Sequence, residues 1–406
     1  MNVNSSRKTG NYTFILIMVL FLISFFDESE ISWLSFAALF STLLIPLIMV
    51  LSFVAHNRRF NKDDKTIALF FAIFMIIQFM GIRWNDLYTS ITPIYRSFSV
   101  LIVVLYFRDF ILTKKIVRAF LCLSALTVVL GFATIFTPAR ENINLLFGNY
   151  NTVGVLYFTL TVLNMLVYFK TYKFSALLLS FLNVAIILIS NTRTALLLLI
   201  ITSVLFILSK LISGKIIKPK VFFPLALILL CVFVYLYYNI KDLPFYEFLN
   251  EISQKLFKKN FDSGRPELWK ITVQTVGAQW LTGMGTGIDL EFFYSTMKTP
   301  HSVFFDIYLQ NGLLGVISYL LCIFVTLKKK GKWESSNLAI FIMIVSFIFI
   351  FYNSVGIVFT KARSGIGLLQ WAIIALMYVC KKNESIKRSV AYDKSYSRNL
   401  QCQRIR

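Results

Sequence analysis

The stretch ISWLSFAALFSTLLIPLIMVLSFVA at residues 31–55 decides the fold class, because it contains no charged side chain. A helix that crosses about 30 Å of hydrocarbon needs roughly 17–25 mainly apolar residues, so this stretch predicts a transmembrane helix. The whole chain agrees: 57% of its 406 residues are hydrophobic and 15% are charged. Soluble domains have about 25% charged residues. The composition excludes a soluble enzyme and predicts one polytopic membrane domain.

Similar apolar stretches recur along the chain. Twelve are long enough to propose as spans, at residues 11–26, 31–55, 66–82, 91–107, 116–136, 152–169, 174–190, 194–208, 221–238, 302–327, 338–355 and 365–380. The predicted fold is therefore all-α, with about 12 transmembrane helices in a single domain over residues 1–380. Residues 381–406 are basic and polar, and they predict a cytoplasmic tail.

The distribution of charge predicts the orientation. If the N-terminus is cytoplasmic and the spans alternate, the cytoplasmic segments hold 28 of the 41 Lys and Arg residues and six of the 19 acids. The whole net charge of +22 then lies on one side, which is the positive-inside pattern. This pattern predicts a multi-pass protein of the inner (cytoplasmic) membrane with both termini in the cytoplasm. It also removes the reason to expect a nucleic acid as partner.

One long loop, residues 239–301, is predicted on the outer side between the ninth and tenth spans. A loop of this length in a compact domain is usually functional or disordered. Its first part predicts an amphipathic helix suited to the lipid interface, because apolar residues recur at helical spacing: Phe245, Phe248, Leu249, Ile252 and Leu256. A second helix is predicted from Pro266 onward, with Ser263 near its cap position. The GMGTG string at 283–287 is expected to form a flexible turn.

Four ionisable residues on the outer side are candidates for function, since such groups are costly near the membrane. Each also has an ordinary role: Arg96 and Arg193 could extend to the interface, Arg265 could pair with Glu267, and His301 could cap the tenth span. Arginine presents a charged fork that matches phosphate oxygens. Histidine can accept a proton from a hydroxyl group near neutral pH. Together they suggest a site for a polyanionic lipid headgroup, provided that they meet in space.

Four motifs carry a resemblance to a known family. They are GNYNTVG at 148–154, NTRTALLLL at 191–199, SGRPELWKITVQTV at 263–276 followed by WLTGMGTG at 280–287, and HSVFFDIYLQNGLLG at 301–315. Their order resembles the O-antigen polymerase and O-antigen ligase superfamily (the Wzy and WaaL type). This sequence departs from the family pattern at Tyr150, where Pro is common, and at Phe304 and Phe305, where Tyr or Leu is frequent.

The resemblance implies a GT-C-like membrane glycosyltransferase that uses an undecaprenyl-pyrophosphate-linked oligosaccharide, with no metal and no cofactor. Arg193 and Arg265 would hold the pyrophosphate, and His301 would act as general base or orient the acceptor. Arg96, together with Asn151 in the 148–154 motif, completes the predicted substrate-binding set. Membrane lipid is an expected partner, as are a chain-length regulator and a flippase of the same pathway.

Several functions remain open at this point. A polymerase would extend a second lipid-linked repeat unit, as in O-antigen or capsule synthesis, and is the favoured prediction. A ligase would use a different acceptor, and no residue in the sequence separates the two. A lipid-linked sugar flippase or transporter also has about twelve spans, but it rarely needs a long structured outer loop. The outer loops contain no Asp-x-Asp string, which gives no reason to expect a metal.

Overall fold

The computed structural model describes most of the chain as helices. The described residues are 3–58, 60–108, 114–136, 146–147, 150–190, 192–211, 219–258, 260–295, 299–327, 337–354 and 365–376, and no strand occurs among them. The predicted tail at 381–406 lies outside this part.

The helices follow the predicted apolar stretches closely. The first group is α1 (Val3–Ser24), α2 (Ser32–Ala55), α3 (Lys62–Met80), α4 (Leu87–Arg108) and α5 (Lys114–Phe136). The second group is α7 (Tyr150–Thr171), α8 (Phe174–Ile189), α9 (Arg193–Leu211) and α10 (Pro219–Tyr238). After these come α11 (Tyr246–Phe257), α12 (Arg265–Val276), α13 (Val303–Leu327), α14 (Asn337–Ser354) and a last helical segment, Gly365–Leu376.

Five of the described helical segments are long and apolar enough to cross a membrane. They are Ser32–Ala55, Trp84–Arg108, Lys114–Thr134, Asn151–Thr171 and Val303–Leu327. The protein is therefore an all-helical integral membrane protein with several spans. The number of twelve spans and the orientation of the termini stay predictions.

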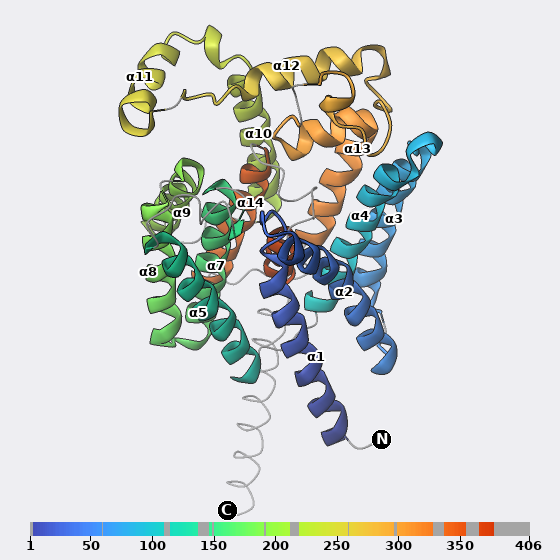
Figure 1. The fold of residues 1–406 in the computed structure, drawn as a ribbon, viewed down its shortest axis with the longest axis vertical. Coiled ribbons are helices and arrows are strands. Elements are labelled where there is room, and N and C mark those ends of the chain that lie inside the picture. The colour runs from blue at the N-terminus through green and yellow to red at the C-terminus, as the bar shows by residue number, and fades with distance from the viewer. Residues whose placement is uncertain are drawn as a thin grey trace, which may run out of the picture.

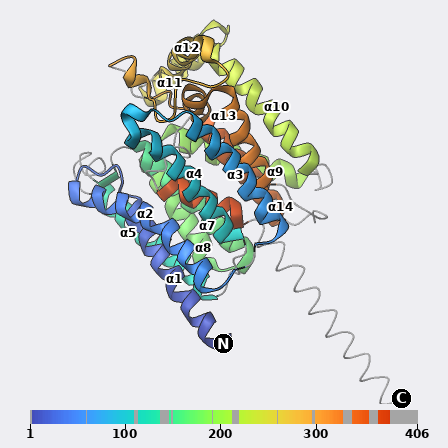
Figure 2. The same ribbon diagram turned by 90° about the vertical axis from the view of Figure 1, so that its right-hand side faces the viewer.

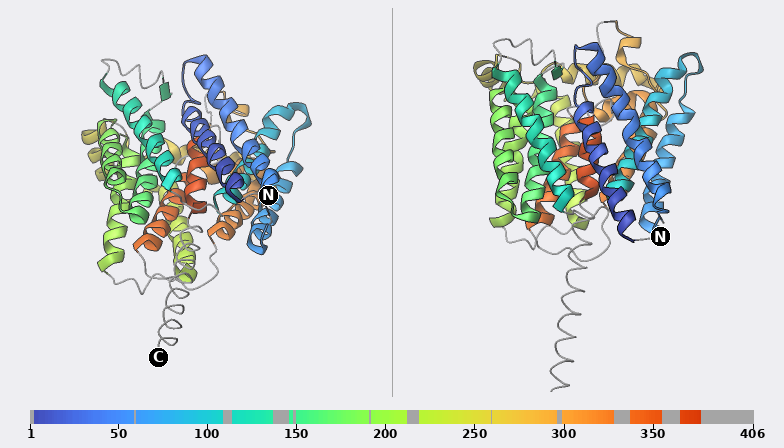
Figure 3. Two further views of the ribbon diagram at one scale, coloured as in Figure 1. Left: turned by 90° about the horizontal axis from the view of Figure 1, so that it is seen from below. Right: turned by 60° about the horizontal axis from the view of Figure 1, so that its bottom comes forward.

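The long helices run side by side as a bundle (Figure 3). The pairs α7 and α8, α1 and α2, and α3 and α13 pack together. The helices α11 and α12 lie at one end of the bundle, and α1 begins at the opposite end (Figures 1 and 2). We call these the loop end and the N-terminal end.

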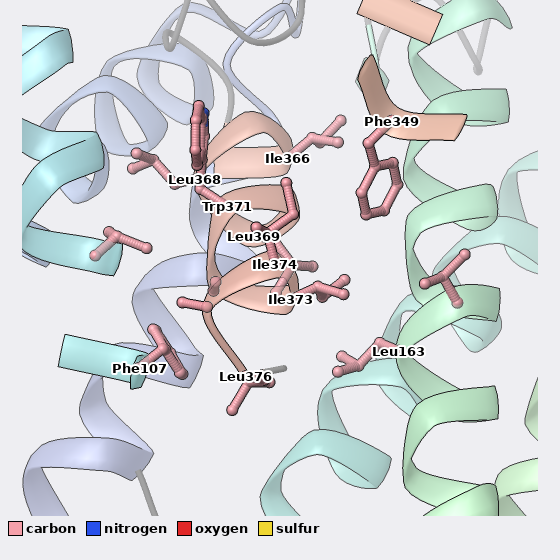
Figure 4. Close-up of a cluster of buried hydrophobic side chains, with 14 of the residues drawn as sticks. Phe107, Leu163, Phe349, Ile366, Leu368, Leu369, Trp371, Ile373, Ile374 and Leu376 are labelled. Carbon is pink, nitrogen blue, oxygen red and sulfur yellow. The ribbon is translucent and has the colours of Figure 1, made fainter. Parts of the chain in front are cut away.

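The centre of the bundle is occupied by the last described helix, Gly365–Leu376. Every side chain position of this segment is buried. Figure 4 shows its apolar side chains directed toward Phe107 of α4, Leu163 of α7 and Phe349 of α14. A helix that is apolar on all sides is expected in such a position, since it has no polar face to present to water.

A group of ion pairs lies at the N-terminal end of the bundle. Arg108, which is only 3% exposed, lies 3.4 Å from the carboxylate of Asp63 and 3.5 Å from that of Asp64. Arg58 approaches Asp64 at 3.9 Å. Asp64 also accepts the backbone N–H of Asn61 in a capping box at the start of α3. We call these two arginines and two aspartates the carboxylate cluster. Their mutual pairing offsets part of the cost of burying charge.

The helix α13 is broken at Gly312, whose φ of 59° and ψ of −159° lie outside the helical range. The backbone groups of residues 309, 310, 313 and 314 therefore bond to residues 280, 281, 284 and 285, with N···O distances of 2.8–3.1 Å. A Cβ atom at Gly312 would lie 2.4 Å from the backbone of Leu281, so no larger residue fits. The expectation of a flexible turn at 283–287 is wrong, because its backbone completes the broken helix.

The same turn is also joined to the first half of the chain through Thr286. Its N–H donates to the carbonyl of Gly81 at 2.8 Å, and its hydroxyl donates to the carbonyl of Gln78 at 2.6 Å. The Ser90 hydroxyl donates to the carbonyl of Thr286 at 3.0 Å. These bonds fix the end of the long loop on the hairpin formed by α3 and α4.

Candidate active site

The first candidate residue, Arg193, begins α9 and reaches into the long loop. Its Nη1 donates to the hydroxyl of Ser253 at 2.9 Å and to the carbonyl of Asn260 at 3.2 Å, and its Nη2 donates to the hydroxyl of Ser263 at 3.2 Å. Ser253 is the buried polar residue of α11. These three acceptors are neutral, and together they orient the guanidinium group.

The predicted apolar stripe of α11 is largely exposed. Phe248 is 65% exposed, and Phe245 and Ile252 are exposed as well. The amphipathic helix therefore exists as described, with a hydroxyl toward Arg193 and apolar side chains outward. Such a face suits the headgroup region of a bilayer.

Close packing against α7 sets the place where α9 begins. A Cβ atom at Gly154 would lie only 2.3 Å from the hydroxyl of Thr192, so glycine allows α7 to approach the residue before Arg193. The motif at 148–154 is thus explained in part by packing. Asn151 lies one turn earlier on α7 and is exposed.

The second candidate, Arg265, is the first residue of α12. Two left-handed residues precede it, Ser263 with φ of 55° and Gly264 with φ of 72°. The N-cap is Gly264, without a side-chain cap bond, so the prediction of Ser263 near the cap is shifted by one residue. The Ser263 hydroxyl instead accepts from Arg193. A left-handed non-glycine residue is costly and is often found at functional sites.

The two guanidinium groups lie close enough to repel each other. Arg193 and Arg265 interact electrostatically, and both interact with the phenol of Tyr237 at the end of α10. The Tyr237 hydroxyl donates to the carbonyl of Asp262 at 2.6 Å, which also accepts the N–H of Arg265 at 3.2 Å. We call Arg193 and Arg265 the arginine pair. Two adjacent guanidinium forks form a binding site for a doubly charged oxyanion.

Glu267, which the sequence offers as a partner for Arg265, pairs with Lys241. Its Oε1 lies 2.5 Å from the Lys241 ammonium group, which also approaches the buried Asp262 at 3.5 Å. The hydrogen bond to Glu267 raises the pKa of Lys241. Burial opposes ionisation of Glu267, but the hydrogen bonds from Lys241 and the backbone and the charges of Lys241 and Lys270 together outweigh it and lower the pKa of Glu267. Glu267 is therefore paired with Lys241 next to the arginine pair.

The third candidate, His301, sits on a turn that is fastened to α12. Trp269, one helical turn after Arg265, donates its Nε1–H to the carbonyl of Pro300 at 2.9 Å. The Trp269 ring stacks on Phe305, with 4.6 Å between the ring centroids. His301 itself is exposed and has a left-handed φ of 51°. The turn thus holds the imidazole at the surface beside the helix that bears Arg265.

Ser302, rather than His301, accepts the hydrogen bonds at the start of α13. Its carbonyl accepts the N–H of Asp306 at 2.9 Å, and its hydroxyl accepts the N–H of Phe305 at 3.5 Å. The N–H of His301 donates to the Thr299 hydroxyl at 3.3 Å. The hydroxyl of Ser302, rather than the side chain of His301, therefore caps the start of α13.

Comparison with known families agrees with this arrangement. Residues 176–320 match the family described as O-antigen ligase. This part of the chain is similar to that family. The match supports the resemblance to the O-antigen polymerase and ligase superfamily. A search of curated proteins finds no match.

The matched residues 176–320 include all three residues predicted as catalytic, Arg193, Arg265 and His301, whereas Arg96 and Asn151 lie before this range. Arg96 is on α4, and α4 and α9 lie on opposite sides of the bundle (Figure 1). The structure therefore groups the arginine pair with the turn of His301, but it places Arg96 elsewhere. Arg96 lines a separate cavity of about 430 Å³.

An apolar groove of about 390 Å³ lies between α10 and α13. Its walls include Tyr238, which follows Tyr237, and Phe304, which precedes Phe305. The groove therefore adjoins the aromatic residues that surround the arginine pair. An apolar groove next to a cationic site has the chemistry of a binding site for a lipid with an anionic headgroup.

Some residues of the site could not be found in the sequence. Tyr237 and Ser253 contact the arginine pair from α10 and α11, and no pattern marks either of them. The sequence does mark Trp269 as a candidate. It stands four residues after Arg265, in a stretch that resembles the Gly-Arg-x-x-x-Trp motif of the ligase family. That spacing puts both residues on one face of α12. Among the described residues, no group of three or more His, Cys, Asp or Glu side chains could hold a metal ion.

Proposed function

We propose that this protein is a polysaccharide polymerase. It transfers a glycan from undecaprenyl pyrophosphate to a hydroxyl group of a second lipid-linked repeat unit at the outer face of the cytoplasmic membrane. The observation that carries the proposal is the meeting of Arg193 and Arg265 beside the turn that holds His301. The match of residues 176–320 to O-antigen ligases supports the same reaction class.

The donor is bound through its two chemically different parts. The pyrophosphate accepts hydrogen bonds from the arginine pair, whose forks match phosphate oxygens. The polyprenyl chain lies in the apolar groove between α10 and α13. Because the arginine pair is already oriented by neutral oxygens of the long loop, little reorganisation is needed when the anion arrives.

The reaction breaks the bond between the anomeric carbon of the donor sugar and the pyrophosphate oxygen. The acceptor oxygen forms the new glycosidic bond, and His301 accepts its proton. The leaving lipid pyrophosphate retains the bonding electron pair as negative charge, which the arginine pair stabilises. In this mechanism, the two guanidinium groups supply the positive charge without a metal ion.

A ligase is the second candidate, because the matching family is described by that activity. It would use the same donor site and differ only in the acceptor. A flippase is disfavoured by the position of the arginine pair, which is bonded to the long loop at one end of the bundle rather than placed along a path through it. A chain-length regulator and a flippase stay predicted partners.

The test uses the full-length protein in nanodiscs with a lipid-linked oligosaccharide donor. Three acceptors are compared: a second lipid-linked repeat unit, lipid A core, and water alone. A ladder of lipid-linked oligomers with the first acceptor supports the polymerase, and a product only on lipid A core shows a ligase. Absence of product with every acceptor, at normal yield of folded protein, contradicts the proposal.

Reporter fusions at Lys62 and Lys258 should give cytoplasmic and external signals, respectively.

A further inference from the structure

The cavity that contains Arg96 is distinct from the donor site. It lies between α3, α4, α13 and the central helix, and its volume of about 430 Å³ falls in the range of about 300–1,000 Å³ typical of small-molecule sites. Its deep wall is aromatic, with Phe71, Phe74 and Trp371. Gly287, Asp289, Glu291 and Thr299 of the long loop line it as well. An aromatic floor with a polar rim suits a sugar ring, which has apolar faces and hydroxyl edges.

A buried hydroxyl group in the wall indicates a missing ligand. Tyr319 of α13 lines the cavity and is only 5% exposed. Its hydroxyl is buried and has no hydrogen-bond partner within the described part of the chain. A buried polar group without a partner costs about 1–3 kcal/mol, so native proteins rarely leave one without a reason. A ligand hydroxyl in the cavity would satisfy it.

The charge of the wall restricts the ligand further. Asp289, Glu291 and Asp306 contribute three carboxylates, and Arg96 contributes the single guanidinium among the cavity's lining residues. Amide and hydroxyl groups of Gln310, Asn311 and Thr299 add neutral donors and acceptors. This wall favours a neutral or cationic ligand with many hydroxyl groups. A ligand with its own carboxylate or phosphate would meet a net negative charge.

The cavity and the donor site flank the turn that bears His301. Thr299 lines the cavity, and its hydroxyl accepts the N–H of His301 at 3.3 Å. On the other side, Pro300 and Phe305 contact Trp269 of α12. A sugar held in the cavity therefore lies next to the turn that carries His301, and the arginine pair lies near the other side of that turn.

We infer that this cavity binds a sugar ring of the acceptor, and that it selects neutral or amino sugars over acidic ones. The binding site and its selectivity follow from the cavity itself, whereas the role as acceptor site rests on the proposed function. Arg96 then contacts sugar hydroxyls rather than pyrophosphate.

The test measures binding of three probes to the full chain in nanodiscs by saturation-transfer NMR: methyl glucoside, methyl glucosaminide and methyl glucuronide. The first two should bind at least about 5-fold more tightly than the glucuronide, which corresponds to about 1 kcal/mol of charge repulsion. Tyr319→Phe removes one hydrogen bond and should weaken glucoside binding roughly 2- to 10-fold. Glu291→Gln should strengthen glucuronide binding. Glu247→Gln, on the exposed face of α11, is the matched control and should change nothing.

The outcomes separate this inference from the proposed function. Equal binding of the three probes, no binding at all, or unchanged binding in both Tyr319→Phe and Glu291→Gln overturns the cavity assignment, even if transfer proceeds. Selective binding of the glucoside in a protein that transfers to no acceptor upholds the sugar site and contradicts the proposed function. Arg265→Ala should abolish transfer while it leaves glucoside binding unchanged, and loss of binding in that variant would show that the two sites are not distinct.

Discussion

The two ends of the bundle use arginine in opposite ways. At the N-terminal end, Arg58 and Arg108 of the carboxylate cluster face aspartates at 3.4–3.9 Å. At the loop end, Arg193 donates to two hydroxyl groups and a carbonyl, and it repels Arg265. In the first case the positive charge is balanced within the protein, so it stabilises the fold. In the second case, neutral hydroxyl and carbonyl groups orient the guanidinium group. We propose that the type of partner, rather than burial, distinguishes a structural arginine from a functional one.

The two histidines extend this comparison, since one lies at each end. His56 is at the end of α2, where its Nδ1 lies 2.8 Å from the carbonyl of Ser52. His301→Ala should lower the transfer rate about 10²–10⁴-fold, the usual contribution of a general base, and leave donor binding intact. His56→Ala should leave the rate unchanged. Both are measured by product formation at saturating donor.

His301→Gln separates two roles of the imidazole, because glutamine can form hydrogen bonds but cannot accept the proton. A rate close to wild type in this variant would show that His301 positions the acceptor. The wild-type rate should also fall as the pH drops through the range in which imidazole is protonated, because only neutral histidine accepts a proton. A rate independent of pH in that range speaks against the general base.

Removing one member of the carboxylate cluster should affect stability rather than transfer. Arg108→Ala leaves the buried Asp64 without its closest cation, and such a loss typically costs about 3–5 kcal/mol. We expect a large drop in the thermal midpoint, with unchanged transfer per folded molecule. Lys65→Ala, on the exposed face of α3, should change stability by less than about 0.5 kcal/mol. An Arg108→Ala protein that is stable but inactive would contradict the comparison.

The arginine pair should show the reverse behaviour. Arg265→Lys keeps the charge but loses the fork, so transfer should fall about 10²–10³-fold while the thermal midpoint stays near that of the wild type. Arg58→Lys in the carboxylate cluster should retain full transfer, because its ion pair with Asp64 at 3.9 Å needs only a point charge. Full activity in Arg265→Lys would show that the pyrophosphate is not held by a bidentate contact.

The smallest effect is expected for the ion pair of Lys241 and Glu267. The lowered pKa of Glu267 means that its stabilising contribution is present above its ordinary value of 4.5 and is lost as the pH falls through the lower folded value. Both side chains are partly exposed, so the contribution at pH 7 is at most about 1 kcal/mol. Hydrogen exchange of α12 should be faster in Glu267→Gln at pH 7, and equal to wild type in acid. A difference that persists in acid would assign the effect to packing.

Much of the fold could be predicted because apolar length and periodicity are local properties. Each of the twelve predicted stretches overlaps a described helix, and α11 and α12 lie where amphipathic spacing and Pro266 indicated. The break at Gly312 was not predicted. It depends on hydrogen bonds to residues about thirty positions earlier, and a hydropathy pattern does not contain that information.

The site was predicted only as a set of separate residues. Arg193, Arg265 and His301 stood out because charge is expensive beside apolar helices, but their partners come from other elements. Ser253 looks like any polar residue on an amphipathic helix until α11 is placed against α9. Arg96 fits the same sequence criterion as Arg193, yet it lies on the other side of the bundle. Charge alone cannot tell two such arginines apart.

The broken helix has a consequence for how relatives of this chain can exchange segments. Residues 280–285 and 309–314 complete one another's backbone hydrogen bonds, and Thr286 joins them to α3. In a membrane, a backbone group without a partner costs several kcal/mol. The stretch from Trp280 to Gly315 should therefore be inherited as one cassette together with the end of α3. A chimera cut inside this cassette should fail to assemble, whereas a cut between α11 and α12 should be tolerated.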